Sequence, residues 1–161
     1  MSLRILRPQE IPRLLEIDRT TPFSSHWSEK GYLSLFDESA ARRLCMVYEE
    51  GPATGEASRI CGFFVVLCLP GDWELENIVV DRASQRRGVG RKLLEALIVA
   101  AAEAGVERLM LEVRASNRAA IALYESAGFT LDGVRKLYYR EPEEDALLMS
   151  LQLEEFPLKI S

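Results

Sequence analysis

Residues 73–104 constrain the fold of this chain most, because they have the pattern of a strand, a basic loop and a long helix. The strand-like run covers residues 73–80, and an amphipathic helix spans residues 88–104. Gly105 can end this helix, since glycine adopts the left-handed conformation that follows many helices. A helix with one apolar stripe buries that stripe against other elements, here a sheet. The stripe consists of Val89, Leu93, Leu94, Leu97, Ile98 and Ala101.

The loop between this strand and helix predicts an anion site. Its glycines allow an anion to approach the backbone closely, and the helix start exposes unpaired N–H groups with a partial positive charge. It lacks the lysine-containing pattern of P-loops, and Leu93 replaces the last glycine of the dinucleotide fingerprint. A solvated arginine turn before a helix is the simpler alternative. The candidate phosphate-binding residues are Gln85, Arg86, Arg87, Gly88, Val89, Gly90 and Arg91.

The order of elements predicts an α/β (α+β) fold in a single domain, residues 1–161. A strand–helix–strand unit in the second half implies a parallel pair, and the first half implies antiparallel hairpins. We therefore expect one mixed, mostly antiparallel sheet with helices on both faces. Residues 51–59 form a predicted mobile hairpin loop without an assigned role. Strands are expected at 3–7, 45–50, 60–69, 73–80, 108–113, 129–137 and 146–153, and helices at 9–19, after Ser28, at 88–104 and at 117–127.

Composition excludes several classes of function. Lys and Arg total 20 and Asp and Glu 25, so the net charge is −5, which argues against a nucleic-acid partner. One histidine and three cysteines without a C-x-x-C pattern predict neither a metal site nor a disulfide framework. The N-terminus lacks an apolar signal region, and the longest apolar run, residues 63–69, is too short for a membrane helix. We expect a cytoplasmic protein.

Three polar residues in the second half are candidates for chemistry. Glu112 lies in an otherwise apolar strand, where a carboxylate is costly unless it is paired or used; an ion pair with a nearby arginine is the alternative. Asn117 can cap the following helix. Tyr124 lies within that helix and can simply pack against the sheet.

The pattern Gln85-x-x-Gly88-x-Gly90 resembles the coenzyme A signature of the Gcn5-related N-acetyltransferase (GNAT) superfamily, and the element order resembles its fold. The resemblance implies that acetyl-CoA is the cofactor and that the parallel strands splay apart where it binds. It implies that backbone amides of residues 85–91 hold the pyrophosphate. It also implies that the preceding strand contacts the pantetheine arm and the thioester through Ile78, Val79 and Val80.

Residues 111–117, 120–126, 128–129 and 27–30, with Tyr138-Tyr139 and the Glu144-Asp145-Ala146 run, resemble the bacterial ribosomal-protein alanine N-acetyltransferases. This resemblance implies acetyl transfer to a protein N-terminus, with a ribosomal protein as the first candidate. Glu112 would be the general base, acting through water, and Tyr124 the general acid. Other branches of the superfamily place a base on the strand before the basic loop, so Glu74 is the rival candidate for the base. Asn117 would contact the cofactor. The peptide slot would be lined by Trp27, Tyr138 and Tyr139.

Two features leave other functions open. His26 stands where that family more often has proline, which weakens the match of the substrate loop. The fold does not determine the acceptor, so a small-molecule amine such as an antibiotic or polyamine is the first alternative. A coenzyme A-binding module without catalysis is the second, although the presence of both Glu112 and Tyr124 argues against it.

Overall fold

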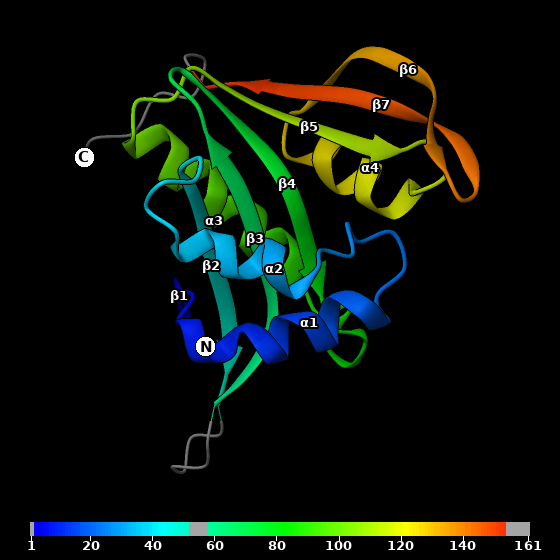
Figure 1. Cartoon of the computed structure of the whole chain (residues 1–161). Coiled ribbons are helices and arrows are strands. Elements are labelled where there is room, and N and C mark those ends of the chain that lie inside the picture. Colours follow the sequence, from blue (N-terminus) through cyan, green and yellow to red (C-terminus); the bar gives the residue numbers. More distant parts are fainter. Residues whose placement is uncertain (1, 52–57, 154–161) are drawn as a thin grey trace.

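The computed structural model describes residues 2–51 and 58–153, and they form a seven-stranded sheet with helices on both faces (Figure 1). The strand order is β1-β2-β3-β4-β5-β7-β6. The strands are β1 (Ser2–Ile5), β2 (Arg43–Glu50), β3 (Arg59–Cys68), β4 (Asp72–Val80), β5 (Arg108–Arg114), β6 (Thr130–Arg140) and β7 (Glu143–Gln152). The α-helices are α1 (Ile11–Thr20), α2 (Glu29–Leu33), α3 (Val89–Glu103) and α4 (Arg118–Ser126).

The single parallel pair joins β4 to β5, and the other neighbouring strands within residues 2–51 and 58–153 pair antiparallel. Pairing of β4 with β5 runs only from Asp72 opposite Arg108 to Leu75 opposite Leu111. Both strands continue beyond these residues without pairing to each other. The predicted mixed sheet and its parallel pair are confirmed, and the parallel strands separate halfway along.

A β-bulge in β4 marks the place where the strands separate. Val65 of β3 lies opposite Asn77 and Val66 lies opposite Leu75, so Glu76 is the extra residue. A bulge shifts the alternation of side chains by one position. As a result, Leu75 packs in the core under α3, whereas Val79 packs in the core under α1 and α2.

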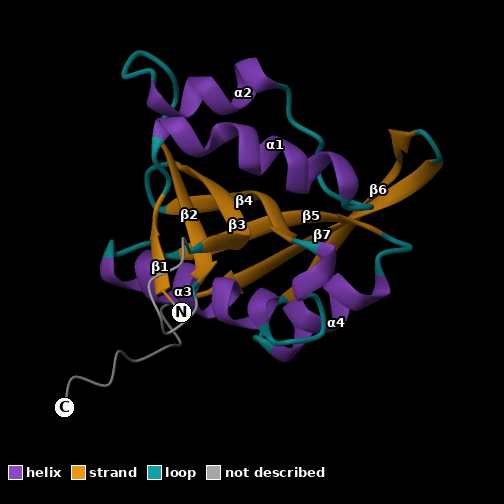
Figure 2. Ribbon diagram, turned by 90° about the horizontal axis from the view of Figure 1, so that it is seen from below, coloured by secondary structure: helices purple, strands orange, loops and turns teal. Residues whose placement is uncertain are grey.

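The sheet has a separate apolar core on each face (Figure 2). Helices α1 and α2 cover one face, and α3 and α4 cover the other. The stripe predicted for α3 is buried at Val89, Leu93, Leu94, Leu97 and Ala101. Side chains without exposed surface in the α1 core include Leu14, Ile17, Tyr32, Val47, Phe63 and Val65.

Several predicted boundaries differ from the structure, chiefly at the start of α1 and in the β6–β7 hairpin. Residues 8–10 form a 3-10 turn, so α1 begins at Ile11 because Pro8 and Pro12 limit where a regular helix can start. The β6–β7 hairpin is longer than expected: β6 continues to Arg140 and β7 begins at Glu143. Its charged residues hide the strand pattern, and Leu137 has a left-handed φ of 49° at an irregularity in the ladder. Residues 52–57 of the predicted loop lie outside the described residues.

Candidate active site

The separation of β4 from β5 opens a cavity of about 220 Å³, here called the reaction pocket. Its walls come from both strands, the start of α4, the β6–β7 hairpin and the loop after α1. Five predicted residues meet in this pocket, namely Ile78, Glu112, Asn117, Tyr124 and Tyr139. The remaining lining residues are Phe23, Ser24, Ser25, Leu75, Glu76, Asn77, Leu111, Val113, Arg114 and Ala120.

Glu112 reaches the pocket because β5 alternates its side chains. Leu111 and Val113 point into the core under α3 and α4, and Glu112 lies on the opposite face. Its Oε1 forms an ion pair with Nη1 of Arg135 at 3.3 Å, and its side chain is 22% exposed. The arginine pairing considered as an alternative is therefore present, and it coexists with a position in the pocket wall.

Glu74, the rival base, does not line the reaction pocket. Burial raises the pKa of Glu74, and the neighbouring carboxylates of Glu112 and Glu76 raise it further. Glu76 forms an ion pair with Arg43 at 2.5 Å. A raised pKa by itself would favour a general base, so the argument against Glu74 is its position outside the wall of the reaction pocket.

Tyr124 is almost fully buried on α4 and packs against Phe129, with ring centroids 5.7 Å apart. Burial raises the pKa of its phenol, and Tyr139 adds to the effect. The phenol therefore stays protonated at neutral and mildly alkaline pH, as a proton donor must. Tyr124 therefore packs in the core and also lines the reaction pocket.

Asn117 and Tyr139 are both held by neighbouring groups. The Asn117 side chain accepts a hydrogen bond from the Ala120 backbone N–H at 3.3 Å, which confirms the predicted helix cap. The Arg114 guanidinium stacks over the Tyr139 ring at 4.1 Å and forms an ion pair with Glu144 at 3.1 Å. Glu144 also accepts a hydrogen bond from the Ser116 backbone N–H, so the hairpin is tied to the start of α4.

A second cavity, here called the loop groove, lies beside the reaction pocket and has a volume of about 510 Å³. The two cavities share Phe23, Ile78, Asn117, Ala120 and Tyr124 in their walls, so they adjoin. Of the predicted cofactor residues, the groove is lined by Ile78, Val80, Gln85, Arg86, Gly88, Val89, Gly90 and Asn117.

The backbone of the loop groove suits an anion. Gly88 is the N-cap of α3 and has a left-handed φ of 78°, with no atom within 4 Å of the position where a Cβ would stand. The first turn of α3 carries N–H groups without intrahelical partners, and they begin at this residue. The positive end of a fifteen-residue helix therefore faces an open, glycine-lined space, which fits a pyrophosphate.

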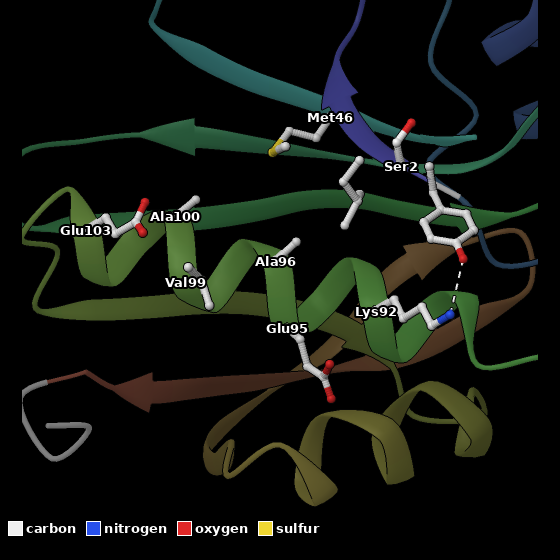
Figure 3. A pocket seen from close by; sticks show the side chains of 10 residues that line it. Ser2, Met46, Lys92, Glu95, Ala96, Val99, Ala100 and Glu103 are labelled. Carbon is white, nitrogen blue, oxygen red and sulfur yellow. Dashed lines mark hydrogen bonds between the residues drawn. The ribbon is translucent and has the colours of Figure 1, made fainter. Parts of the chain in front are cut away.

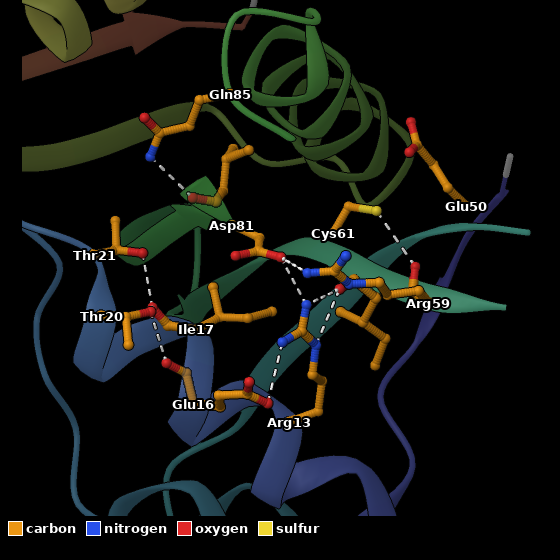
Figure 4. Close-up of polar contacts among 12 residues, drawn as sticks. Arg13, Glu16, Ile17, Thr20, Thr21, Glu50, Arg59, Cys61, Asp81 and Gln85 are labelled. Atoms are coloured by element: carbon orange, nitrogen blue, oxygen red, sulfur yellow. Dashed lines mark hydrogen bonds and ion pairs between the residues drawn. The ribbon is translucent and has the colours of Figure 1, made fainter. Parts of the chain in front are cut away.

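A partly buried ion-pair cluster anchors the strand end in front of this loop (Figure 4). Asp81 forms an ion pair with Arg13 of α1 at 2.8 Å and another with Arg59 of β3. Arg13 also donates to the carbonyl oxygen of Ile60 at 3.0 Å. The Gln85 side chain donates to the carbonyl oxygen of Val80 at 3.2 Å, which closes the loop on its own strand. The loop thus begins from a rigid point shared by three elements.

Besides Arg91, four predicted site residues have side chains outside both cavities. Arg87 turns toward β2 and forms an ion pair with Glu50 at 3.3 Å. The side chain of Val79 belongs to the core under α1, and Val79 lines neither cavity. Trp27 packs on Tyr32 at 5.4 Å, and Tyr138 packs edge-on against Tyr139 at 5.2 Å.

The structure also differs from expectation at two further positions. Arg91 lines a neighbouring cavity of about 260 Å³ between α3 and α4 instead of the loop groove. Phe23, Ser24 and Ser25 line the reaction pocket, although the sequence indicated only a connecting loop there. The available signal in the sequence was a phenylalanine among polar loop residues, and in the structure Phe23 is 52% exposed.

Another cavity, of about 550 Å³, lies between α3 and strands β1 and β2 (Figure 3). Figure 3 shows Met46, Ala96, Val99 and Ala100 along it, and Lys92 donates to the Tyr48 hydroxyl at 3.3 Å. None of the predicted site residues lines it. Within the described residues no cluster of three or more His, Cys, Asp or Glu side chains suits a metal ion. In the same residues no helix has the length and apolarity to span a membrane.

Comparisons with known proteins agree with this geometry. The family model of the acetyltransferase (GNAT) family matches residues 11–129. The [ribosomal protein bS18]-alanine N-acetyltransferase of Escherichia coli K12 is 45% identical over 154 residues, which cover 94% of this chain and 97% of that protein.

Solved structures give the same result. The crystal structure of the ribosomal-protein-S18-alanine N-acetyltransferase from Escherichia coli superposes with a TM-score of 0.79 at 36% identity, covering 94% of this chain and 93% of that one. A Salmonella typhimurium structure, yncA with its cofactor acetyl-CoA, has a TM-score of 0.78 at 22% identity and covers 95% and 94% of the two chains. The family match spans most of the chain, including the strand, glycine loop and helix from which the fold was predicted. This chain is therefore an acetyltransferase that belongs to the GNAT family.

Proposed function

We propose that this enzyme transfers the acetyl group of acetyl-CoA to the α-amine of a protein N-terminus, with a ribosomal protein as the first candidate. The observation that carries the proposal is the adjoining pair of cavities, which places Glu112 and Tyr124 in one pocket next to the glycine loop. The names of the relatives support the choice of acceptor.

The loop groove is the proposed binding site for acetyl-CoA, which supplies an acetyl thioester and a thiol leaving group. The start of α3, with Gly88 and Gly90, would bind the pyrophosphate through backbone N–H groups. Ile78 and Val80 line the groove, and the β4 backbone beyond Leu75 no longer pairs with β5. Its backbone N–H groups would bind the thioester oxygen and polarise the carbonyl carbon.

Glu112 is the proposed general base. A protein α-amine has a pKa of about 7.7–8.0, so only a modest driving force is needed to remove its proton. Glu112 would accept this proton, directly or through a water molecule, while the amine nitrogen forms its bond to the acetyl carbon. The carbon–sulfur bond breaks as the carbon–nitrogen bond forms. Tyr124 would then donate its phenolic proton to the leaving sulfur, and proton exchange with solvent restores both groups.

The first experiment tests the acceptor. The protein is mixed with acetyl-CoA and a short peptide beginning Ala-Arg and carrying one internal lysine, and mass spectrometry locates the acetyl group. Acetyl on the α-amine supports the proposal. Acetyl on the lysine alone, or none on the peptide with transfer to a small amine, contradicts it.

Glu112→Gln tests the base. The variant preserves side-chain shape, and we expect kcat to fall about a hundredfold because general base catalysis is lost. The affinity for acetyl-CoA, measured by calorimetry, should change less than twofold. Glu74→Gln is the matched control and should retain most activity. If Glu112→Gln stays fully active and Glu74→Gln does not, the base assignment is wrong.

A further inference from the structure

The carboxyl group of Asp18 is fully buried near the end of α1, although the proposed mechanism does not use it. It accepts hydrogen bonds from the backbone N–H groups of His26 at 3.1 Å and Trp27 at 2.9 Å, and from the Tyr32 hydroxyl. In residues 2–51 and 58–153 no ion pair joins Asp18. Burying a carboxyl without a cation is costly, so the contacts it makes call for an explanation.

The hydrogen-bond network continues from Tyr32 to β4, the strand that lines both cavities. The Asn77 side-chain amide donates to the Tyr32 hydroxyl at 3.3 Å, and its oxygen accepts from the Ser25 backbone N–H at 3.2 Å. Ser25 Oγ donates to the carbonyl oxygen of Glu76 at 2.7 Å. Asp18 is therefore connected, through two buried side chains, to the bulge of β4 beside the reaction pocket.

The segment held in this way is residues 21–27, here called the acceptor loop. Phe23 and His26 have left-handed φ values of 67° and 48°, which are unfavourable for side chains of their size. External contacts must therefore maintain the loop conformation. The loop places Phe23, Ser24 and Ser25 in the wall of the reaction pocket, and Phe23 also lines the loop groove.

We propose that Asp18 is a positioning residue, which fixes the acceptor loop against β4 and thereby sets the affinity for the acyl acceptor. The two N–H groups it binds belong to the loop itself, and the hydroxyl it binds leads to β4. Loss of this network would let Phe23 leave the pocket wall, while Glu112, Tyr124 and the glycine loop stay in place on separate elements.

Asp18→Asn and Tyr32→Phe test this inference. Asparagine retains one acceptor oxygen and phenylalanine retains the buried ring, so each variant removes part of the network and little volume. For each, we expect the KM for the acceptor to rise about tenfold. The kcat should change less than threefold, and the KM for acetyl-CoA should rise less than the acceptor KM, because Phe23 is one of many residues that line the loop groove. Because both act through one network, the double variant should raise the acceptor KM little more than either single variant.

A stability control separates positioning from a purely structural role. Val47→Ala removes volume from the same core without touching the network, so it should lower the melting temperature and leave the acceptor KM unchanged. All variants are assayed well below their melting temperatures. An unchanged acceptor KM in Tyr32→Phe, or an equal rise in Val47→Ala, would overturn the inference.

The choice of acceptor rests on the proposed function, and the wild-type protein tests that choice first. If the wild type acetylates a small amine instead of the Ala-Arg peptide, the proposed function fails, and the same variants are measured with that amine. The two failures are therefore distinguishable.

Discussion

Tyr124 shows how a single residue's surroundings select its protonation state. Its ring is buried against Phe129 while the residue still lines both cavities. Burial raises the pKa of the phenol, so the protonated form persists to higher pH than for an exposed tyrosine. The same burial that stabilises the core therefore keeps a proton donor available next to the proposed thioester site.

Tyr124→Phe should lower kcat about a hundredfold, because the leaving sulfur loses its proton donor. In the wild type, kcat should not fall between pH 7 and pH 10, since the raised pKa of Tyr124 keeps the phenol protonated across that range. Measuring kcat against pH for both proteins checks these expectations. A wild-type rate that declines with an apparent pKa near 9, with no decline in Tyr124→Phe, would contradict the assignment of the donor.

The glycine loop and α3 form an element in which two glycines have different tasks. Gly88 adopts a left-handed φ of 78° with open space around it, so its task is conformational. Gly90 has an ordinary helical conformation, and an added Cβ would lie 3.4 Å from Leu123 and 3.7 Å from Val80. Both glycines line the loop groove, and the proposed task of Gly90 is to leave space for acetyl-CoA.

Alanine substitutions separate the two tasks. Gly88→Ala should lower the free energy of unfolding by about 1–2 kcal/mol, because left-handed backbone is costly for alanine. Gly90→Ala should leave stability nearly unchanged and weaken acetyl-CoA binding about tenfold, since the new methyl group occupies the groove. Thermal unfolding and calorimetric titration measure the two effects. Equal binding by Gly90→Ala and wild type would show that the cofactor lies elsewhere.

At the scale of the whole molecule, ion pairs attach the edge strand β1 to its neighbours. Arg4 of β1 forms ion pairs with Glu10 at 2.5 Å and with Glu49 of β2 at 2.6 Å. This guanidinium lowers the pKa of both carboxyls. A lowered pKa in the folded state means that stability is present above the unfolded value, near pH 4.3, and is lost as pH falls through the folded values.

Arg4→Met should therefore lower the melting temperature at pH 7 by roughly 2–4 °C, equivalent to about 1 kcal/mol. The difference from wild type should shrink below pH 4 and disappear once both carboxyls are protonated. Calorimetry between pH 3 and pH 7 measures this trend. A difference that is constant over the range would mean that Arg4 acts through packing and not through its charge.

The fold could be predicted because its signals are local. The apolar stripe of α3, the glycine at its start and the cap at Asn117 each act within a few residues of chain. These signals were sufficient for the element order, the parallel pair and helices on both faces. The β6–β7 hairpin was predicted too short, because an irregular ladder around Leu137 depends on contacts such as that of Asp145 with the Leu137 N–H at 2.9 Å.

The candidate site was predictable only in part. Glu112, Asn117, Tyr124 and Tyr139 were singled out from the sequence, and all four line the reaction pocket. The acceptor loop was not, because its role depends on Asp18 and Asn77, which lie far from each other in the chain. No local pattern indicates that a buried aspartate binds a loop eight residues later and that an asparagine of β4 continues its network.

The sequence by itself therefore determined the elements, the order in which they follow one another and the chemical types available for acetyl transfer. Only the tertiary structure decided which of these residues share a cavity. Separation of β4 from β5 at Leu75 opens the pocket, and Arg87, Trp27 and Tyr138 are directed to other neighbours. The physical reason is that helix and strand patterns act over a few residues, whereas cavities arise from packing between distant segments.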